Sequence, residues 1–121
     1  MKIAYIAHPI SGDVKENIKK IINIIRTVNL EEPLTVPFAP YIPDCIALND
    51  ADPIQRQRGI SNDVELFNRG FIDELRLYGN TLSRGMIEEI KIAKNKNIPI
   101  RAMNALLQEK LESLLITNPN K

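Results

Sequence analysis

Residues 77–100 read LYGNTLSRGMIEEIKIAKNKNIPI, and this stretch decides the fold. It begins as an apolar strand and passes through polar turn formers between Gly79 and Ser83. Ser83 can cap a helix by accepting a hydrogen bond from a free backbone amide. Apolar residues then recur at helical spacing, namely Met86, Ile87, Ile90 and Ala93. A new strand begins at Ile98, so the stretch predicts one half of a βαβ unit.

The loop before this helix has two features that suggest chemistry. Gly79 and Gly85 let the backbone approach a ligand closely, and the free amides at the helix start favour an anion such as phosphate. Glu89 lies about one and a half turns into the helix, where the helix dipole is expected to favour its ionised form. An ionised carboxylate beside a phosphate is a candidate nucleophile for a sugar carbon. A glutamate near a helix start is also common for purely structural reasons.

Composition limits the class of protein. The chain has 121 residues, 44% hydrophobic and 26% charged, which is typical of one globular domain spanning residues 1–121. The net charge of +1 gives no basic field for nucleic acid or a membrane surface. A single cysteine, Cys45, and a single histidine, His8, exclude an intramolecular disulfide and a zinc cluster, so no metal is expected. Neither a membrane span nor a signal peptide is evident, which predicts a cytoplasmic protein.

The first part of the chain repeats the arrangement of strand, loop and helix. Residues 2–8 form an apolar strand, followed by a loop that contains Ser11 and Gly12. An amphipathic helix is expected from Asp13 onward. Because this loop also holds a Ser-Gly pair, a second helix start is expected to face the same cleft as the one at Ser83.

The middle of the chain is less regular. A strand at 34–38 contains Pro37, which suits an edge position. A long connection follows, with a short helix expected at 44–48, and then a helix at 54–69 with Gly59 as a potential break. In the third strand, 71–78, Glu74 and Arg76 alternate with leucines. One face of that strand is therefore less apolar than a central parallel strand should be, which predicts partial exposure or a subunit contact. The last expected helix is 103–115.

Strands that alternate with helices predict a three-layer α/β fold, a doubly wound parallel sheet of four to five strands of the flavodoxin/Rossmann-like kind. In such sheets ligands bind beyond the carboxyl ends of the strands. The residues expected around that pocket are Tyr5, His8, Ser11, Pro40, Tyr41, Ser83 and Glu89. The sequence has neither GxGxxG nor GxxxxGK[ST], so no dinucleotide or nucleoside triphosphate cofactor is expected.

Two segments resemble a known family. YIAHPISG, at 5–12, is similar to the opening strand and loop of the nucleoside 2-deoxyribosyltransferase-like superfamily. SRGMIEEIKIAKNKNIPI, at 83–100, is similar to its nucleophile helix and the strand that follows. The resemblance covers roughly residues 1–100 and is closest to a small branch with the pattern YGxxxSxGMxxEIxxA.

The resemblance implies a role for each matching residue. Glu89 would be the nucleophile that attacks the anomeric carbon, and Tyr5 would help to position it and the sugar. Asp63 would protonate or hold the departing base. Ser83 stands where the family's transferases carry an aspartate and its nucleotide N-glycosidases a phosphate-binding serine. Because a carboxylate there would repel phosphate, Ser83 favours a nucleoside 5′-monophosphate over a free nucleoside.

Further contacts follow from the same resemblance. Ser11 and Gly12 would supply more phosphate contacts. Apart from the resemblance, the position of His8 at the end of a strand suggests that it could stack on or bond a base. The implied mechanism is a retaining displacement, resolved by water in a hydrolase or by a second base in a transferase. A neighbouring subunit completes the pocket in the resembling enzymes, so a homodimer or larger homo-oligomer is expected.

Several alternatives remain open from the sequence. Tyr5 could be only a core aromatic, and His8 could be satisfied by backbone. Three other acids, Asp44, Asp50 and Asp52, compete with Asp63, and Glu88 competes with Glu89. The protein could instead be a non-catalytic nucleotide-binding module or a structural subunit. GNTLSRGMIEE also loosely resembles the loop of lysine-decarboxylase-like phosphoribohydrolases, although the double glycine of that group is missing.

Overall fold

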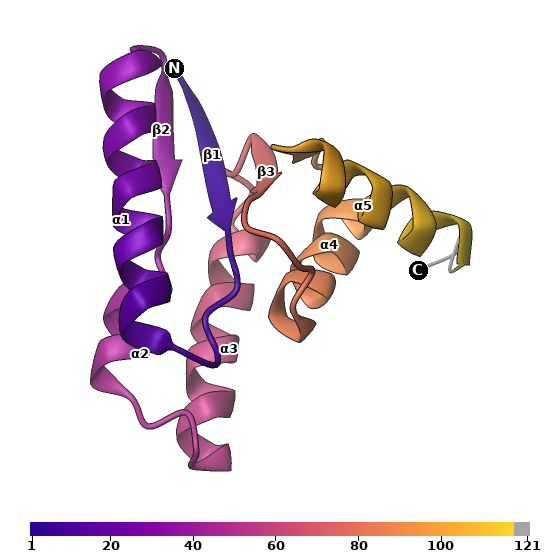
Figure 1. The fold of residues 1–121 in the computed structure, drawn as a ribbon. Coiled ribbons are helices and arrows are strands. Elements are labelled where there is room, and N and C mark those ends of the chain that lie inside the picture. The colour runs from indigo at the N-terminus through magenta and orange to yellow at the C-terminus, as the bar shows by residue number, and fades with distance from the viewer. Residues whose placement is uncertain (118–121) are drawn as a thin grey trace.

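Four parallel strands form one sheet in the order β2-β1-β3-β4 in the computed structural model, which describes residues 1–117 (Figure 1). The elements in chain order are β1 (Lys2–Ala7), α1 (Val14–Glu31), β2 (Thr35–Phe38), α2 (Ile42–Ala47), α3 (Pro53–Asn68), β3 (Glu74–Leu77), α4 (Arg84–Asn95), β4 (Ile100–Ala102) and α5 (Ala105–Thr117). The alternation of strands and helices predicted from the sequence is confirmed.

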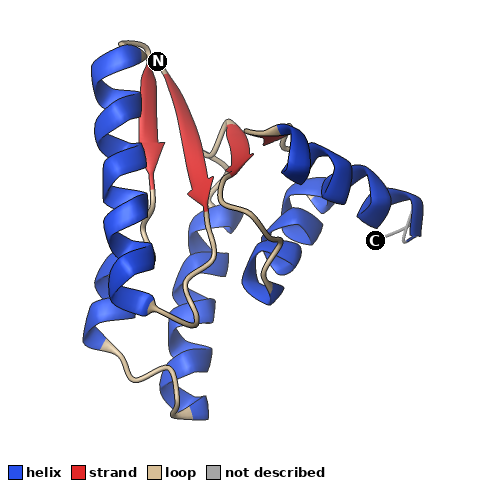
Figure 2. Cartoon of the chain, viewed as in Figure 1, coloured by secondary structure: helices blue, strands red, loops and turns tan. Residues whose placement is uncertain are grey.

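The strand order creates a crevice at one edge of the sheet. The chain runs from β1 outward to β2, then returns past β1 to β3 and continues to β4. Tyr5 pairs with Phe38 on one side and with Leu75 on the other. The arrowheads of β1, β2 and β3 point to the same edge in Figure 2. Because the order reverses between β1 and β3, their carboxyl ends mark the place where ligands bind in such sheets.

Helices cover both faces of the sheet, as the sequence predicted. One face carries Tyr5 and Leu77 and packs against Phe67 of α3, Ile90 of α4 and Leu107 of α5 in one hydrophobic core. The opposite face lies against α1, which leads from β1 to β2 (Figure 1). Side chains in a strand alternate between faces, so Tyr5 points to the α3–α4 side while its neighbours point towards α1.

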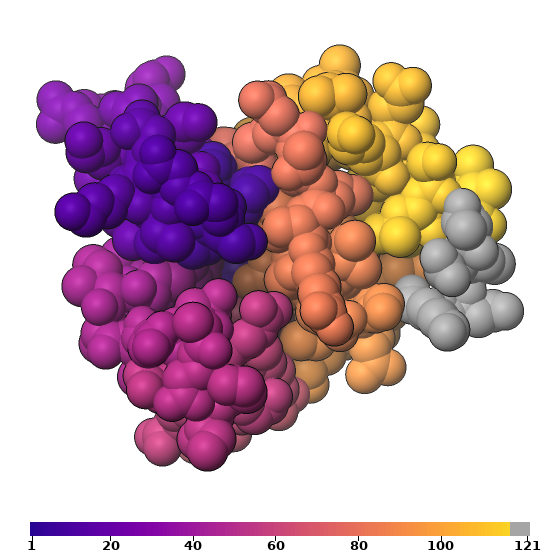
Figure 3. All heavy atoms as spheres, turned by 60° about the horizontal axis from the view of Figure 1, so that its bottom comes forward, coloured from indigo at the N-terminus to yellow at the C-terminus, as the bar shows by residue number. Residues whose placement is uncertain are grey.

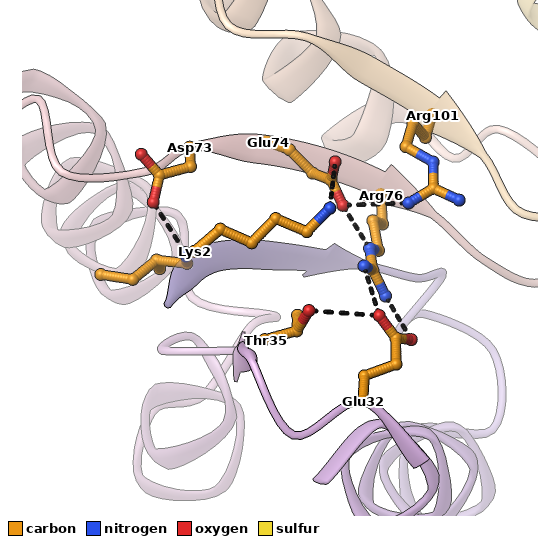
Figure 4. Close-up of polar contacts among 8 residues, drawn as sticks. Lys2, Glu32, Thr35, Asp73, Glu74, Arg76 and Arg101 are labelled. Carbon is orange, nitrogen blue, oxygen red and sulfur yellow. Dashed lines mark hydrogen bonds and ion pairs between the residues drawn. The ribbon is translucent and has the colours of Figure 1, made fainter.

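The charged residues of β3 are buried, so the prediction of a partly exposed strand is wrong. Glu74 is 6% exposed and Arg76 only 1%. The Arg76 guanidinium donates Nη1 and Nη2 to the two oxygens of Glu32, at 2.9 and 2.8 Å, and Nε to Glu74 (Figure 4). Lys2 and Arg101 also contact Glu74, at 3.2 and 3.4 Å. We call these five residues the arginine cluster; charge pairing replaces apolar packing on this face.

Several boundaries differ from those predicted. β3 begins at Glu74 rather than Phe71, since Gly70 turns the chain with a φ of 75°. β4 begins at Ile100 rather than Ile98, because Asn97 ends α4 in a left-handed conformation with φ of 58°. α3 runs unbroken through Gly59. α2 starts at Ile42, two residues before the predicted start. β2 lies at the sheet edge, which confirms the interpretation of Pro37.

Among the helices described for residues 1–117, none combines the length and the apolar character that crossing a membrane requires.

Candidate active site

Tyr5 is held in place by other aromatic rings. Its side chain is fully buried, and its ring centroid lies 4.7 Å from that of Phe67, 5.9 Å from Tyr41 and 6.3 Å from Phe38. Aromatic pairs at such distances have preferred tilted or edge-on geometries. Tyr5 is therefore a core aromatic residue, as one of the alternatives from the sequence proposed. The same packing fixes the position of its hydroxyl.

Two acids from different helices meet at the hydroxyl of Tyr5. The Tyr5 oxygen lies 2.8 and 2.6 Å from the two carboxyl oxygens of Asp63 on α3, and 2.5 Å from Oε2 of Glu89 on α4. Asp63 precedes the buried Phe67 by one helical turn, so both face the sheet. These three residues are separated by up to 84 positions in sequence, yet the fold joins them. We call them the carboxyl–tyrosine cluster.

The choice between Glu88 and Glu89 is settled by the helix face. Glu89 follows the buried Met86 by three residues and precedes the buried Ala93 by four. Residues at these spacings share one face, so Glu89 points inward. Glu88 is exposed and pairs with Lys91 at 3.3 Å. Glu89, and not Glu88, therefore faces Tyr5, while its role as nucleophile stays a prediction.

The carboxyl–tyrosine cluster crowds three acids together. Burial is the main cause that raises the pKa of Glu89 well above its usual value, and the charge of Asp63 raises it further. Burial also raises the pKa of Asp63, although hydrogen bonds with Tyr5 and Glu89 offset part of that effect. The pKa of Tyr5 is raised by burial, then by Glu89 and Asp63. Two carboxyl groups this close do not both ionise readily, so the pair favours a state that holds one proton.

This result corrects one expectation from the sequence. The helix dipole was expected to favour the ionised form of Glu89. In the fold, burial and the neighbouring Asp63 act in the opposite direction and dominate. The dipole effect falls off within the first turn, and Glu89 is the sixth residue of α4.

The start of α4 has the predicted cap. The Ser83 hydroxyl oxygen accepts a hydrogen bond from the amide of Met86 at 3.3 Å. Gly85 and Arg84 are exposed in the first turn, and a Cβ added to Gly85 would meet nothing within 4 Å. Arg84 makes no ion pair with any residue of the described chain, 1–117. Ser83 and Gly85 thus lie on the helix that carries Glu89, with space and a positive charge beside them.

His8 follows the end of β1, and its Nε2 would lie 3.5 Å from a Cβ added at Gly79, in the loop after β3. Its Nδ1 is 2.7 Å from the carbonyl oxygen of Pro9. Because a carbonyl only accepts, Nδ1 carries the proton, and Nε2 is left as an acceptor in the neutral ring. Gly79 approaches closely with φ of 95°, and a Cβ there would lie 2.9 Å from Cδ of Pro9. The backbone therefore satisfies one ring nitrogen of His8, and the other faces the junction of the two loops.

Ser11 and Gly12 are not joined to the other predicted site residues. Both are exposed, and no hydrogen bond within residues 1–117 links them to the carboxyl–tyrosine cluster. The helix α1 is capped by Asp13, whose carboxylate accepts from the amide of Glu16 at 3.2 Å. A carboxylate at this position repels a phosphate. The start of α1 is therefore not a second anion site equivalent to the start of α4, contrary to the expectation from the Ser-Gly pair.

The competing acids of the long connection have other partners. Asp44 accepts a hydrogen bond from Asn62 at 3.0 Å, and Asp52 caps α3 by accepting from Ile54. Asp50 lies 3.8 Å from Arg56. Asp63 alone among the four contacts Tyr5 within the described residues. The prediction of Asp63 over its competitors agrees with this geometry.

Two further residues lie near the pair: Tyr41, which was predicted to line the pocket but was given no chemical role, and Cys45, which was not predicted there. Tyr41 packs on Tyr5, and Cys45 is close enough to the acids that its pKa is raised to about 11, first by burial and then by Asp50 and Asp44. The only sequence signal was an aromatic residue directly after Pro40, where an edge strand ends. Among residues 1–117, no three histidine, cysteine, aspartate or glutamate side chains are arranged to hold a metal ion.

Figure 3 looks onto the edge where the strands end. The surfaces of the loop after β1, the α2–α3 segment and the α4 segment meet there around a recess. These segments supply His8, Tyr41, Asp63 and Glu89. Predicted site residues therefore come from three segments of the chain that meet on one edge of the molecule.

Comparison with known proteins gives one match. No curated protein and no solved structure matches this chain. A family model described as a domain of unknown function, DUF7768, matches residues 2–103, which include Tyr5, Asp63 and Glu89. Because the match spans most of the 121 residues, the chain belongs to the DUF7768 family.

Proposed function

We propose that this protein cleaves or transfers the N-glycosidic bond of a nucleoside 5′-monophosphate or a nucleoside, with Glu89 as the nucleophile. The observation that carries the proposal is the meeting of Tyr5, Asp63 and Glu89 at hydrogen-bond distance. The resemblance to the nucleoside 2-deoxyribosyltransferase-like superfamily assigned these same three residues to one reaction. Two acids with different roles, oriented by a fixed phenol, suit a displacement that needs a nucleophile and a proton donor.

The shared proton supplies the acid for the first step. The pKa values of both acids are raised, and Glu89 acts as the nucleophile when the shared proton is on Asp63. The Glu89 carboxylate then attacks C1′ of the sugar and forms an ester. The C1′–N bond breaks, its electron pair stays on the base, and Asp63 gives the base its proton. Tyr5, whose raised pKa keeps it a donor, stabilises the carboxylate that remains.

The second step restores the starting state. Water, or the nitrogen of a second base, attacks C1′ and displaces the Glu89 carboxylate. Asp63 takes the proton from the attacking group, so the pair again holds one proton. Two displacements at C1′ retain its configuration. Since the first half of the cycle needs Asp63 protonated and the second half needs it ionised, the rate is expected to fall at both low and high pH.

The start of α4 supports a phosphorylated substrate. Free amides at a helix start and the exposed Arg84 favour an anion there. Ser83 keeps its hydroxyl hydrogen available while its oxygen caps the helix. The carboxyl–tyrosine cluster carries negative charge and would repel a phosphate. We therefore place the phosphate beside Ser83 and Gly85, and the glycosidic bond beside Glu89.

The test is base release from a panel of ribo- and deoxyribonucleoside 5′-monophosphates and nucleosides, followed by chromatography. Glu89→Gln should lower the rate by about a thousandfold or more, since it removes the nucleophile while keeping the shape. Glu88→Gln is the matched control on the neighbouring residue and should leave the rate unchanged. Intact-mass measurement after acid quenching should detect a glycosyl adduct in the wild type that Glu89→Gln lacks. Addition of a second base separates transfer from hydrolysis.

Two outcomes would overturn the proposal. One is base release that survives in Glu89→Gln. The other is a raised melting temperature with nucleotides but no base release from any of them, which would indicate a nucleotide-binding module.

We also propose that the protein forms a homodimer or larger homo-oligomer. The support is the resemblance, together with large apolar side chains left exposed on α2 and α3: Ile46 is 71% exposed, Ile54 81% and Ile60 44%. Exposed apolar groups gathered on one part of a surface often mark an interface. A monomer by light scattering at micromolar concentration would contradict this.

A further inference from the structure

Tyr41 lies where the pairing of β1 with β2 stops. The register of these strands ends with Tyr5 opposite Phe38, so Ile6 has no partner residue on β2. The Tyr41 hydroxyl donates to the Ile6 carbonyl oxygen, with 2.5 Å between the two oxygens. A buried carbonyl without a partner is costly. The phenol of Tyr41 therefore replaces the next rung of the ladder and holds the end of β1.

Tyr41 also contacts the proposed catalytic groups. Its ring lies 5.9 Å from that of Tyr5, at an angle of 45°. Burial raises its pKa most, and the charges of Glu89 and Asp63 raise it further. The adjoining helix α2 is tied to α3 by the hydrogen bond from Asn62 to Asp44. Tyr41 thus joins the strand that carries Tyr5 to the helix pair that carries Asp63.

We propose that Tyr41 is a positioning residue, which keeps the Tyr5 hydroxyl between Asp63 and Glu89 by holding both the end of β1 and the ring of Tyr5. This inference rests on the proposed function. The contacts from Tyr5 to the acids are 2.5 to 2.8 Å long, so a displacement of about 1 Å would break them. Tyr41 itself makes no covalent step.

The experiment compares Tyr41→Phe with Tyr78→Phe. Each variant removes one phenolic hydroxyl and keeps the ring. Tyr78 is a suitable control because its hydroxyl lies beside Arg76, in the arginine cluster. We expect Tyr41→Phe to lower kcat for base release by about tenfold, with little change in KM, because it disturbs orientation rather than binding. Tyr78→Phe should stay within about twofold of the wild type.

A second measurement does not need activity. The carboxyl carbons of Asp63 and Glu89 can be followed by NMR in protein labelled with ¹³C at aspartate and glutamate. The groups that face this pair are Tyr5 from β1, and Tyr41, Asp44 and Cys45 from the α2 segment. Because the hydrogen bond from Tyr5 lowers the pKa of Glu89, we expect the Glu89 titration to move further above its ordinary range in Tyr41→Phe and to stay in place in Tyr78→Phe.

The results separate the two proposals. If the wild type releases no base, the proposed function fails, while a moved titration still supports positioning by Tyr41. If Tyr41→Phe only lowers the melting temperature, with kcat and the Glu89 titration unchanged, Tyr41 is a structural residue and the inference is overturned.

Discussion

The two faces of the sheet differ in whether their buried acids are paired with cations. On the α1 side, the arginine cluster sets Arg76, Lys2 and Arg101 against Glu32 and Glu74 (Figure 4). On the α3–α4 side, the carboxyl–tyrosine cluster brings two acids and a phenol together, and no cation lies within salt-bridge distance of them among residues 1–117. Strand β1 contributes to both clusters, with Lys2 in the first and Tyr5 in the second.

The pKa directions record this difference. Hydrogen bonds from Arg76 lower the pKa of Glu32 to about 2, and Arg76 and Lys2 lower that of Glu74 against the effect of burial. The pKa values of Asp63 and Glu89 are raised instead. A lowered carboxyl pKa means that ionisation assists folding, and a raised one means that ionisation opposes it. Carboxyl groups with a raised pKa are typical of functional sites, whereas carboxyl groups with a lowered pKa stabilise the fold.

The largest effect expected is on the arginine cluster. Arg76→Gln should lower the free energy of unfolding by about 3 to 5 kcal/mol, because it leaves the buried Glu74 without its nearest cation. Urea unfolding at neutral pH measures it. Arg69→Gln is the matched control, since its pair with Glu65 is 70% and 59% exposed and should contribute less than about 0.5 kcal/mol. Equal losses in the two variants would remove the distinction between buried and surface pairing.

The next effect has the opposite sign. Glu89→Gln should raise the free energy of unfolding at pH 8 by about 1 to 2 kcal/mol. Glutamine keeps the shape of the side chain and removes a carboxyl group whose ionisation is disfavoured by burial and by Asp63. The folded pKa of Glu89 lies above the unfolded value of 4.5, so the folded wild type binds more protons and loses stability as pH rises from about 4.5. The gain in the variant should therefore grow between pH 5 and pH 8.

Urea unfolding across that range tests the sign. Glu88→Gln serves as the control, since Glu88 is exposed. A Glu89→Gln variant that is less stable than the wild type at pH 8 would show that the pair stabilises the fold rather than opposing it.

The smallest effect concerns Glu32 in acid. Its folded pKa of about 2 lies below the unfolded value of 4.5, so its contribution is present above pH 4.5 and is lost as pH falls towards 2. The side chain is 40% exposed, and solvent screening reduces the contribution to about 0.5 to 1 kcal/mol. Glu32→Gln should flatten acid unfolding followed by circular dichroism at fixed urea. Glu31, the exposed neighbour, is the control. A Glu31→Gln curve as flat as that of Glu32→Gln would contradict the contribution assigned to Glu32.

Local patterns predicted most of the fold. The spacing of Met86, Ile90 and Ala93 identified α4 and its inner face, and that face in turn selected Glu89 over Glu88. Ser83 capped the helix as expected, and Pro37 marked an edge strand. These features depend on neighbours within one or two turns, so the sequence displays them directly.

Distant contacts explain what the sequence could not predict. Glu74 and Arg76 resembled exposed residues because the partner of Arg76, Glu32, lies 44 positions away. The pKa of Glu89 depends on Asp63, which another helix supplies. Tyr41 has its place because β2 stops pairing at Phe38, and no local pattern shows where a ladder ends.

By itself, the sequence determined the order of strands and helices, the parallel sheet, and the inward face of α4, since these follow from periodicity, caps and turn residues. Only the tertiary structure decided which charges are paired and which are opposed. The physical reason is that a charge buried by folding takes its pKa from the groups packed around it, and those groups come from segments that are distant in the chain.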